Sequence, residues 1–484
     1  MSKSLAKNTI YKLILNIFNT GLPFILGMYI TRALGTKAYG NFTYIQGIYQ
    51  YFLAFATFGV YQYGLREISK VRDNKDRLSK VFSNIFIITL LSNLIVGGIY
   101  ILSMHLIFAN SSVLHSIAVV MGINFFANIF YVEWAAEALE RFDFITIKTI
   151  LVQTISCIVT IILVKSAKDV TMYVLILGIT LFFNYFASFV FIKRRIDFNF
   201  KALNFKKHIK PMFLVVILTN ASILYTNLDK IMLGSVVGKV YVGYYFMCVG
   251  IIYAINNLLL TFVQVTIPRL SYHLSKGENQ IYKSLLDRMS KMYLMILFPA
   301  AIGVSVIGKE CILLYGGKDY IDAVPLMPFF AIYMIIVGYE NIVSNQIMYL
   351  NGRERQQVVC VFIGGIVNLI LNSLCIVLGI FSAKVAITTT IIANFVLVIC
   401  EYVYVRKNLK IHINLFGLDK IKYFIISLIF IPITIILRKY IKNMFLLLMG
   451  VILINLLIYL FILVIIKDKI ILELINNVKR KIKS

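Results

Sequence analysis

An adjacent acid and base, Asp229 and Lys230, lie near the end of an apolar run that is long enough to cross a membrane, LVVILTNASILYTNLDKIMLGSVVG (214–238). Placing such charges in hydrocarbon costs several kcal/mol each unless they are paired or face water. A lysine at this position could attract the phosphate of a substrate, whereas an aspartate could hold a neighbouring cation or bind a coupling ion. The pair is therefore the first candidate for a transport site.

Polar residues at three- and four-residue steps share one face of a helix. Such stripes run along the apolar segments at about 11–33 and about 211–233, and their candidates are Asn16, Asn19 and Arg32 in the first segment and Asn220, Asn227 and Lys230 in the second. The stripes could line a polar path through the membrane. For the amides, helix packing through small polar residues explains the pattern equally well. For the charges, the cost of burial favours a function.

Other polar groups lie within or beside later apolar segments. Glu340 and Asn345 fall inside the segment at about 324–347, with Glu340 more than a full turn from its end. Gln264 and Arg269 flank the end of the segment at about 241–263. A snorkelling side chain at the interface would explain Arg269 as well as a binding role would. These residues complete the set of polar groups that could line a cavity or bind a coupling ion.

Enzyme chemistry finds no support in the motifs. The five histidines are scattered without HExxH, and the six cysteines lack CxxC spacing. The stretch LLYGGKDY (313–320) lacks the spacing and the Ser or Thr of a phosphate-binding loop. We therefore expect no enzyme activity, no metal and no cofactor. Transport driven by a gradient of the substrate or of a coupling ion, H⁺ or Na⁺, remains.

The composition defines the elements that must position these groups. The chain has 484 residues, of which 60% are hydrophobic and 14% charged, far fewer charges than a soluble protein carries. Its apolar residues come in blocks of about 20, the length of a membrane-spanning helix. The sequence predicts an all-α polytopic membrane protein with about 14 spans, at approximately 11–33, 42–64, 82–104, 114–134, 144–164, 170–192, 211–233, 241–263, 291–314, 324–347, 357–379, 384–405, 421–441 and 443–466.

The basic residues indicate the topology. Of the 48 lysines and arginines, 36 fall in one alternate set of loops and tails and 11 in the other, and Lys230 lies inside a span. Because cytoplasmic loops accumulate Lys and Arg, both termini are predicted in the cytoplasm. The net charge of +27 is therefore read as a topology signal and not as a nucleic-acid surface. The basic stretch 193–210 could in addition contact anionic lipid headgroups.

The two halves of the chain share landmarks in the same order. RALGTKAYGNFTY (32–44) and KIMLGSVVGKVYVGYY (230–245) each place a cation before Leu-Gly, cross a glycine-containing loop and re-enter through aromatic residues. The sequence predicts a six-helix bundle at 1–200, a basic cytoplasmic linker at 201–210, a second six-helix bundle at 211–405, and two extra helices with a basic tail at 406–484. Since six is even, the repeat is parallel and the substrate path is expected between the bundles.

Several of these landmarks resemble bacterial polysaccharide flippases of the Wzx type, in the multidrug/oligosaccharidyl-lipid/polysaccharide exporter superfamily. The likeness covers roughly residues 5–410, while the last two spans are not distinctive. It is carried by ITRALGTKAYGNF (30–42), FGVYQYGLREISKVRDN (58–74), NLDKIMLGSVVGKVYVGYY (227–245), LLYGGKDYIDAVPLM (313–327) and LNGRERQ (350–356).

The resemblance implies a transporter that flips undecaprenyl-pyrophosphate-linked oligosaccharide units to the outer leaflet of the bacterial cytoplasmic membrane, for capsule or O-antigen. Alternating access around a cationic cavity is the implied mechanism. Membrane lipids are expected partners, and the glycosyltransferases and the polymerase of the same glycan are further candidates. Carried over by motif, the residues of interest are Arg32, Arg66, Asp229, Lys230 and Arg269.

Alternative functions stay open. A cation-coupled drug antiporter of the same superfamily could use Asp229 and Glu340, and a lipid II flippase would share the pyrophosphate and the lipid of the substrate. A membrane glycosyltransferase or polymerase would normally have a large outer loop, and here the longest is only about 10–15 residues. A pure scaffold would leave the charges inside the membrane unexplained.

Overall fold

The structure, a computed structural model, describes residues 2–201, 203–412 and 414–473, without the side chains of part of the first helix and of residues 218–226. Every regular element in these ranges is helical, which confirms the predicted all-α class. The reason is general: a backbone in hydrocarbon must satisfy its own hydrogen bonds, and a helix does so within one segment.

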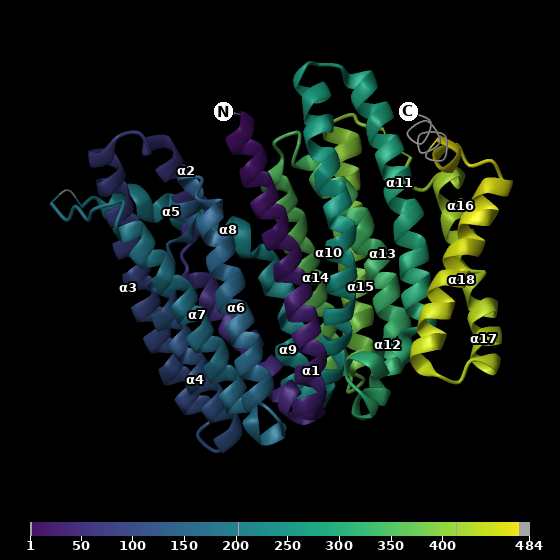
Figure 1. Cartoon of the computed structure of the whole chain (residues 1–484), viewed down its shortest axis with the longest axis horizontal. Coiled ribbons are helices and arrows are strands. Elements are labelled where there is room, and N and C mark those ends of the chain that lie inside the picture. The colour runs from purple at the N-terminus through teal and green to yellow at the C-terminus, as the bar shows by residue number, and fades with distance from the viewer. Residues whose placement is uncertain (1, 202, 413, 474–484) are drawn as a thin grey trace. The chain divides into compact units, whose positions relative to one another are not determined.

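The helices follow one another along the chain with short connections (Figure 1). Four of the elements are short turns: η1 (Ala167–Asp169) and η3 (Lys318–Leu326) have 3₁₀ geometry, and η2 (Leu233–Val237) and η4 (Ser344–Met348) are wider π turns. The α-helices are α1 (Ser2–Ala56), α2 (Val60–Val71), α3 (Lys75–Ile107), α4 (Ser112–Asn128), α5 (Glu133–Ala138), α6 (Phe142–Leu163), α7 (Val170–Lys193), α8 (Phe205–Thr226), α9 (Leu228–Met232), α10 (Lys239–Ser275), α11 (Asn279–Val306), α12 (Gly308–Tyr315), α13 (Met327–Val343), α14 (Glu354–Val377), α15 (Ala383–Asn408), α16 (Leu418–Ser427), α17 (Phe430–Tyr440) and α18 (Met444–Ile465).

Within the described residues, 12 helical stretches are long and apolar enough to cross a membrane. One of them, Ile14–Val71, covers two predicted spans, 11–33 and 42–64, and the others each overlap one predicted span. The remaining predicted span, 211–233, overlaps α8 and α9. The multi-pass class is thus confirmed, while the count of fourteen and the cytoplasmic placement of both termini stay predictions.

Gly35 divides α1 into two arms. Its φ of 67° and ψ of 178° are not helical, yet the residues on both sides are. Glycine tolerates this left-handed φ because it has no Cβ. The sequence predicted a glycine-containing loop after Leu34. In the structure this one residue changes the direction of the chain, and helical geometry resumes at Thr36 and continues to Ala56.

The chain divides into two compact units, each described here by itself. Unit 1 consists of Met1–Met247 with Asn372–Ala383, and unit 2 of Cys248–Leu371 with Lys384–Ser484. In unit 1, α4 packs along both α3 and α7, and α6 packs against α7 (Figure 1). Near one end of these helices, the buried indole of Trp134 covers Gly64 and donates to the Tyr131 carbonyl at 3.0 Å. The predicted bundle limits at 200 and 211 stay predictions.

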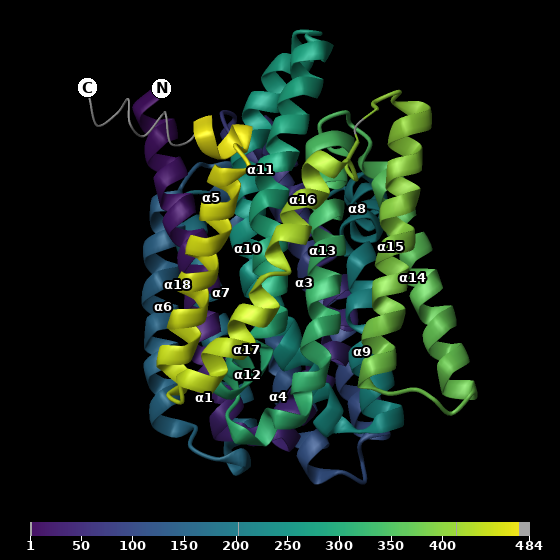
Figure 2. The ribbon, with the colours of Figure 1, turned by 90° about the vertical axis from the view of Figure 1, so that its right-hand side faces the viewer.

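In unit 2, α11 packs against α13 on one side and against α16 and α17 on another. The three C-terminal helices α16, α17 and α18, yellow in the pictures, lie along α11 (Figures 1 and 2). Near the middle of α18, the buried Tyr459 hydroxyl donates to the Met295 carbonyl of α11 at 2.8 Å. The C-terminal helices are therefore an integral part of unit 2.

Candidate functional site

Asp229 and Lys230 lie on the five-residue helix α9, which is followed directly by the wide turn η2. At Gly238 the φ is 135°, and α10 begins at the next residue. A π turn inside helical structure shifts the side chains that follow it and is frequent at functional sites. The chain therefore presents the acid and the base from an interrupted stretch of helix and not from the interior of a long one.

Asp229 has neutral hydrogen-bond donors as partners. The Tyr245 hydroxyl donates to Oδ2 at 2.6 Å, and Asn372 Nδ2 donates to Oδ1 at 3.0 Å. The residue is 2% exposed. Such donors stabilise a buried carboxylate without neutralising its charge.

Lys230 is 8% exposed, and its Nζ lies 4.5 Å from the centre of the Phe246 ring. Its methylene groups pack against α1 at Gly47, where an added Cβ would come within 2.9 Å of them. Within the described part of the chain, Lys230 forms no ion pair with Asp229 or with another carboxylate. The amino group is thus buried beside an aromatic face, and no carboxylate among the described residues pairs with it.

The two glycine landmarks of the repeat contact each other within unit 1. A Cβ at Gly40 would lie 1.8 Å from the Lys239 carbonyl oxygen, and one at Gly243 would lie 2.7 Å from that of Thr36. Tyr44 and Ser235 share a hydrogen bond of 3.2 Å. Only residues without a Cβ permit so close a backbone approach. This contact holds the interrupted stretch with Lys230 against α1.

The other predicted residues of unit 1 have different surroundings. Asn227 is buried and donates to Gln50 Oε1 at 3.4 Å, whereas Arg32, Asn16 and Asn19 are exposed. Arg66 on α2 is exposed, donates to Glu67 Oε1 at 3.1 Å and lies over the Tyr63 ring. The side chain of Asn220 lies outside the described residues. Of this set, the structure brings Asn227, Asp229 and Lys230 together on one short stretch.

Unit 2 holds the remaining predicted residues. Gln264 and Arg269 are exposed on α10, and Asn345 donates to the Asn341 carbonyl at 3.2 Å. Glu340 on α13 lies four residues before Ser344, whose hydroxyl donates to Glu401 on α15 at 2.9 Å, and the two acids are near enough for their charges to interact. The structure therefore places Glu340 beside a second acid, which the sequence reasoning missed.

Glu401 is completely buried, and its Oε1 accepts a hydrogen bond from Ser344 at 2.9 Å. Gln357 in turn donates to Ser344 at 2.6 Å. Oε2 of Glu401 has no partner among the described residues. An acid in the stretch VLVICEYVYV (396–405) was the available signal, but its position near the end of a predicted span reads as interfacial. Glu401, like Asp229, accepts a hydrogen bond from a neutral donor.

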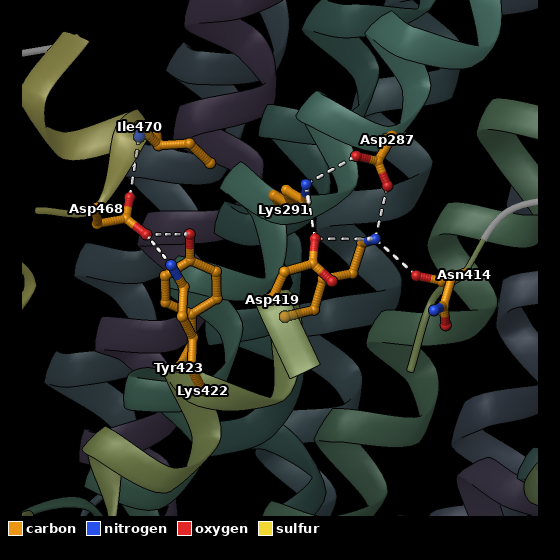
Figure 3. Close-up of polar contacts among 9 residues, drawn as sticks. Asp287, Lys291, Asn414, Asp419, Lys422, Tyr423, Asp468 and Ile470 are labelled. Atoms are coloured by element: carbon orange, nitrogen blue, oxygen red, sulfur yellow. Dashed lines mark hydrogen bonds and ion pairs between the residues drawn. The ribbon is translucent and has the colours of Figure 1, made fainter. Parts of the chain in front are cut away.

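A second cluster of charges in unit 2 is fully paired (Figure 3). Lys420 of α16 donates to Asp287 of α11 and to the Asn414 carbonyl, both at 2.6 Å. Lys291 bonds Asp287 at 3.0 Å and Asp419 at 2.6 Å. Near the C-terminal end of α17, Arg438 donates two hydrogen bonds to the carboxylate of Glu310, at 2.9 and 2.7 Å. These pairs attach the C-terminal helices to the rest of unit 2.

The family described as polysaccharide biosynthesis protein matches residues 5–273. A candidate O-antigen transporter of Escherichia coli (strain K12) is 24% identical over an alignment of 381 residues that covers 76% of this chain and 89% of that protein. A candidate O-antigen transporter of Shigella dysenteriae is 22% identical over 370 residues, in an alignment that covers 75% of this chain and 91% of that protein. Both similarities extend over most of each chain.

The fold is shared with solved membrane transporters. A structure described as the lipid II flippase MurJ in an inward closed conformation has a TM-score of 0.70 at 17% identity, over 96% of this chain and all of that one. An inward-facing multidrug resistance MATE family transporter of the MOP superfamily has a TM-score of 0.63 at 12% identity, over 83% of this chain and 98% of that one. Since the family match spans residues 5–273 of 484, the chain belongs to the polysaccharide biosynthesis protein family and is a multi-pass protein of the bacterial cytoplasmic membrane.

Proposed function

We propose that this protein flips an undecaprenyl-pyrophosphate-linked oligosaccharide unit from the cytoplasmic to the outer leaflet, for the synthesis of a surface polysaccharide such as capsule or O-antigen. Glycosyltransferases would supply the lipid-linked unit and a polymerase would consume it. The observation that carries the proposal is Lys230, a buried cation without a carboxylate partner among the described residues, in a chain of the polysaccharide biosynthesis family.

The pyrophosphate is the part of this substrate that hydrocarbon rejects most strongly. A lysine in a low-dielectric cavity attracts phosphate oxygens as a compact charge. Its described partner, the face of Phe246, is worth about 0.5–2 kcal/mol, so a charged oxygen can replace it at little cost. Arg32, exposed at the corresponding place in the first repeat, would be the second phosphate contact. The two halves would then alternate access around the bound headgroup.

The acids of unit 2 are suited to bind a coupling ion. Two carboxyl groups that lie close together in a dry interior cannot both ionise without a high cost, so one shared proton is the favourable state. Glu340 and Glu401 form such a pair, and Oε2 of Glu401 accepts no hydrogen bond from the described residues. We therefore propose H⁺ as the coupling ion. A Glu401→Gln variant in vesicles should flip substrate at a rate that no longer responds to a pH gradient.

The test of the substrate uses cells that make a defined surface polysaccharide. Lys230→Ala and Arg32→Ala should abolish the polysaccharide and leave lipid-linked units on the cytoplasmic leaflet, with normal amounts of protein in the membrane. Lys37→Ala, which removes an exposed cation close to Gly35, is the matched control and should behave as wild type. Normal polysaccharide in both test variants would contradict the proposal.

The fold likeness to a lipid II flippase supports one rival substrate. Deleting the gene separates the two functions, because loss of a lipid II flippase stops wall growth, whereas loss of a polysaccharide flippase removes only the surface glycan. Raised drug sensitivity with normal glycan would instead identify a drug antiporter.

A further inference from the structure

An open groove lies at the C-terminal end of α7, in unit 1 and away from Lys230 in the sequence. Its volume is about 770 Å³, and it is lined by Phe144 of α6 and by Phe186, Val190, Phe191, Arg194 and Arg195 at the end of α7. The lining therefore combines an aromatic wall with two cations. Neither the family nor the proposed flipping of substrate accounts for it.

The wall of the groove is apolar and aromatic. The rings of Phe144 and Phe191 are stacked, with centroids 3.7 Å apart and an angle of 7° between their planes. Phe186 remains 39% exposed although it is one of the large apolar side chains. Aromatic side chains near a membrane surface lie at the level of the headgroups and can pack against acyl chains.

The arginine side chains lie beside this aromatic wall. The Arg195 guanidinium lies 3.6 Å from the centre of the Phe191 ring and donates to the Phe191 carbonyl at 3.0 Å. Arg141 lies 5.2 Å from the centre of the same ring. Asp143 accepts two hydrogen bonds from Arg141, both at 3.1 Å, so its charge is already offset. The remaining positive charge belongs to Arg194 and Arg195.

The positive charges of these arginines lie close to one another as well as being exposed. Burial lowers the pKa of the Arg195 guanidinium, and the positive charges of Arg141 and Arg194 lower it further, against the opposing effect of Asp143. An anion placed among these groups would relieve the repulsion. The segment 193–210 that follows has seven basic residues and one acid, Asp197, which adds to the attraction for an anionic membrane surface.

We propose that this groove binds an anionic glycerophospholipid, with the headgroup phosphate on Arg194 and Arg195 and an acyl chain against Phe144, Phe186 and Phe191. Arginine suits a phosphate because its planar fork can donate two parallel hydrogen bonds. The lipid-linked oligosaccharide is a poor fit, because a glycan needs hydroxyl or amide partners and the lining side chains contain none. The inference does not depend on the proposed flipping activity.

Binding can be measured by native mass spectrometry of the full-length protein, with phosphatidylglycerol and phosphatidylcholine as probes. Wild type should retain phosphatidylglycerol at least about tenfold more tightly than phosphatidylcholine. Arg194→Gln with Arg195→Gln should lose most of that preference, because the choline cation offsets the phosphate of phosphatidylcholine, whereas phosphatidylglycerol presents a net negative charge to the two arginines. Arg194→Gln alone should show a partial loss and serves if the double variant folds poorly.

The matched control is Lys206→Gln with Lys207→Gln, which removes two exposed charges from the same basic segment outside the groove. This control should keep the preference for phosphatidylglycerol. Phe186→Ala should weaken binding while leaving both arginines in place. The proposal would be overturned by equal losses in the two double variants or by unchanged binding in Arg194→Gln with Arg195→Gln. Displacement by free glycerol phosphate at similar concentration, or tighter binding of a polyprenyl-linked glycan, would overturn it as well.

Discussion

Lys420 in unit 2 and Lys230 in unit 1 are both almost completely buried, at 1% and 8% exposed, but their ammonium groups have different partners. Lys420 donates to the Asp287 carboxylate and to the Asn414 carbonyl (Figure 3). Lys230 lies against the ring of Phe246 and has no ion pair within the described residues. One ammonium group thus has an acid and a carbonyl as partners, whereas the other has an aromatic ring.

This difference is the one that we expect between a structural charge and a charge that binds a ligand. A saturated pair holds its helices in one arrangement, because breaking it leaves an uncompensated group behind. A buried charge with a weak, uncharged partner destabilises the fold and persists when binding requires it. In this protein the saturated pairs attach α16 to α11 and α17 to α12, whereas Lys230 lies where the two glycine landmarks of the repeat meet.

The largest expected effect comes from Lys230→Met, which keeps most of the packing against Gly47 and removes the charge. Losing one charge-assisted contact of about 1.5–3 kcal/mol should lower the flipping rate roughly 10- to 100-fold. The thermal midpoint of the purified protein should stay constant or rise, since a buried charge without an acid partner is removed. A fall in the midpoint with normal flipping would assign Lys230 to structure and remove the contrast with Lys420.

Gly40→Ala tests the contact that holds the Lys230 region in place. The new Cβ would lie 1.8 Å from the Lys239 carbonyl oxygen, so the backbones must separate. We expect a loss of about 1–3 kcal/mol in unfolding free energy together with reduced flipping. Gly98→Ala is the matched control, because no atom lies within 4 Å of the added Cβ. Equal midpoints for the two variants would show that the close approach is dispensable.

Lys420→Met should affect stability alone. The substitution leaves Asp287 without its bond from Lys420, but Asp287 is 38% exposed and keeps its bond from Lys291. The cost should therefore be about 1–2 kcal/mol, measured as a lower thermal midpoint. Flipping per folded molecule should remain at the level of wild type. A loss of flipping at normal stability would place this cluster in the transport cycle.

The smallest effect concerns pH. Burial acts to raise the pKa of the Asp468 carboxyl, but hydrogen bonds from Lys422, from the Ile471 N–H and from Tyr423 outweigh it and lower the pKa below its ordinary value. The stabilisation is complete above the unfolded pKa of about 4 and is lost as the pH falls through the folded value. Wild type should exceed Asp468→Asn in thermal midpoint at pH 7, with a gap that closes below about pH 4. A gap that does not change with pH would rule out this ion pair as its cause.

The sequence predicted which charges lie within the apolar segments but not which residues surround them. Asp229, Lys230 and Glu340 stand out because charge is rare inside apolar runs. The partner Asn372 lies 143 residues from Asp229, and no local pattern links the two. Glu401 was missed because an acid near the end of a span resembles an ordinary interfacial residue. Its burial depends on η4 and α14, which supply Ser344 and Gln357 through long-range packing.

The sequence by itself determined the class of the protein and its helical segments. This follows from a local rule: an apolar run of about 20 residues in a bilayer must form a helix, whatever its neighbours are. Tertiary structure alone decided that Lys420 meets Asp287 and that Lys230 meets an aromatic ring. The partner of a buried charge depends on which helices pack together, and that packing depends on contacts between residues far apart in the chain.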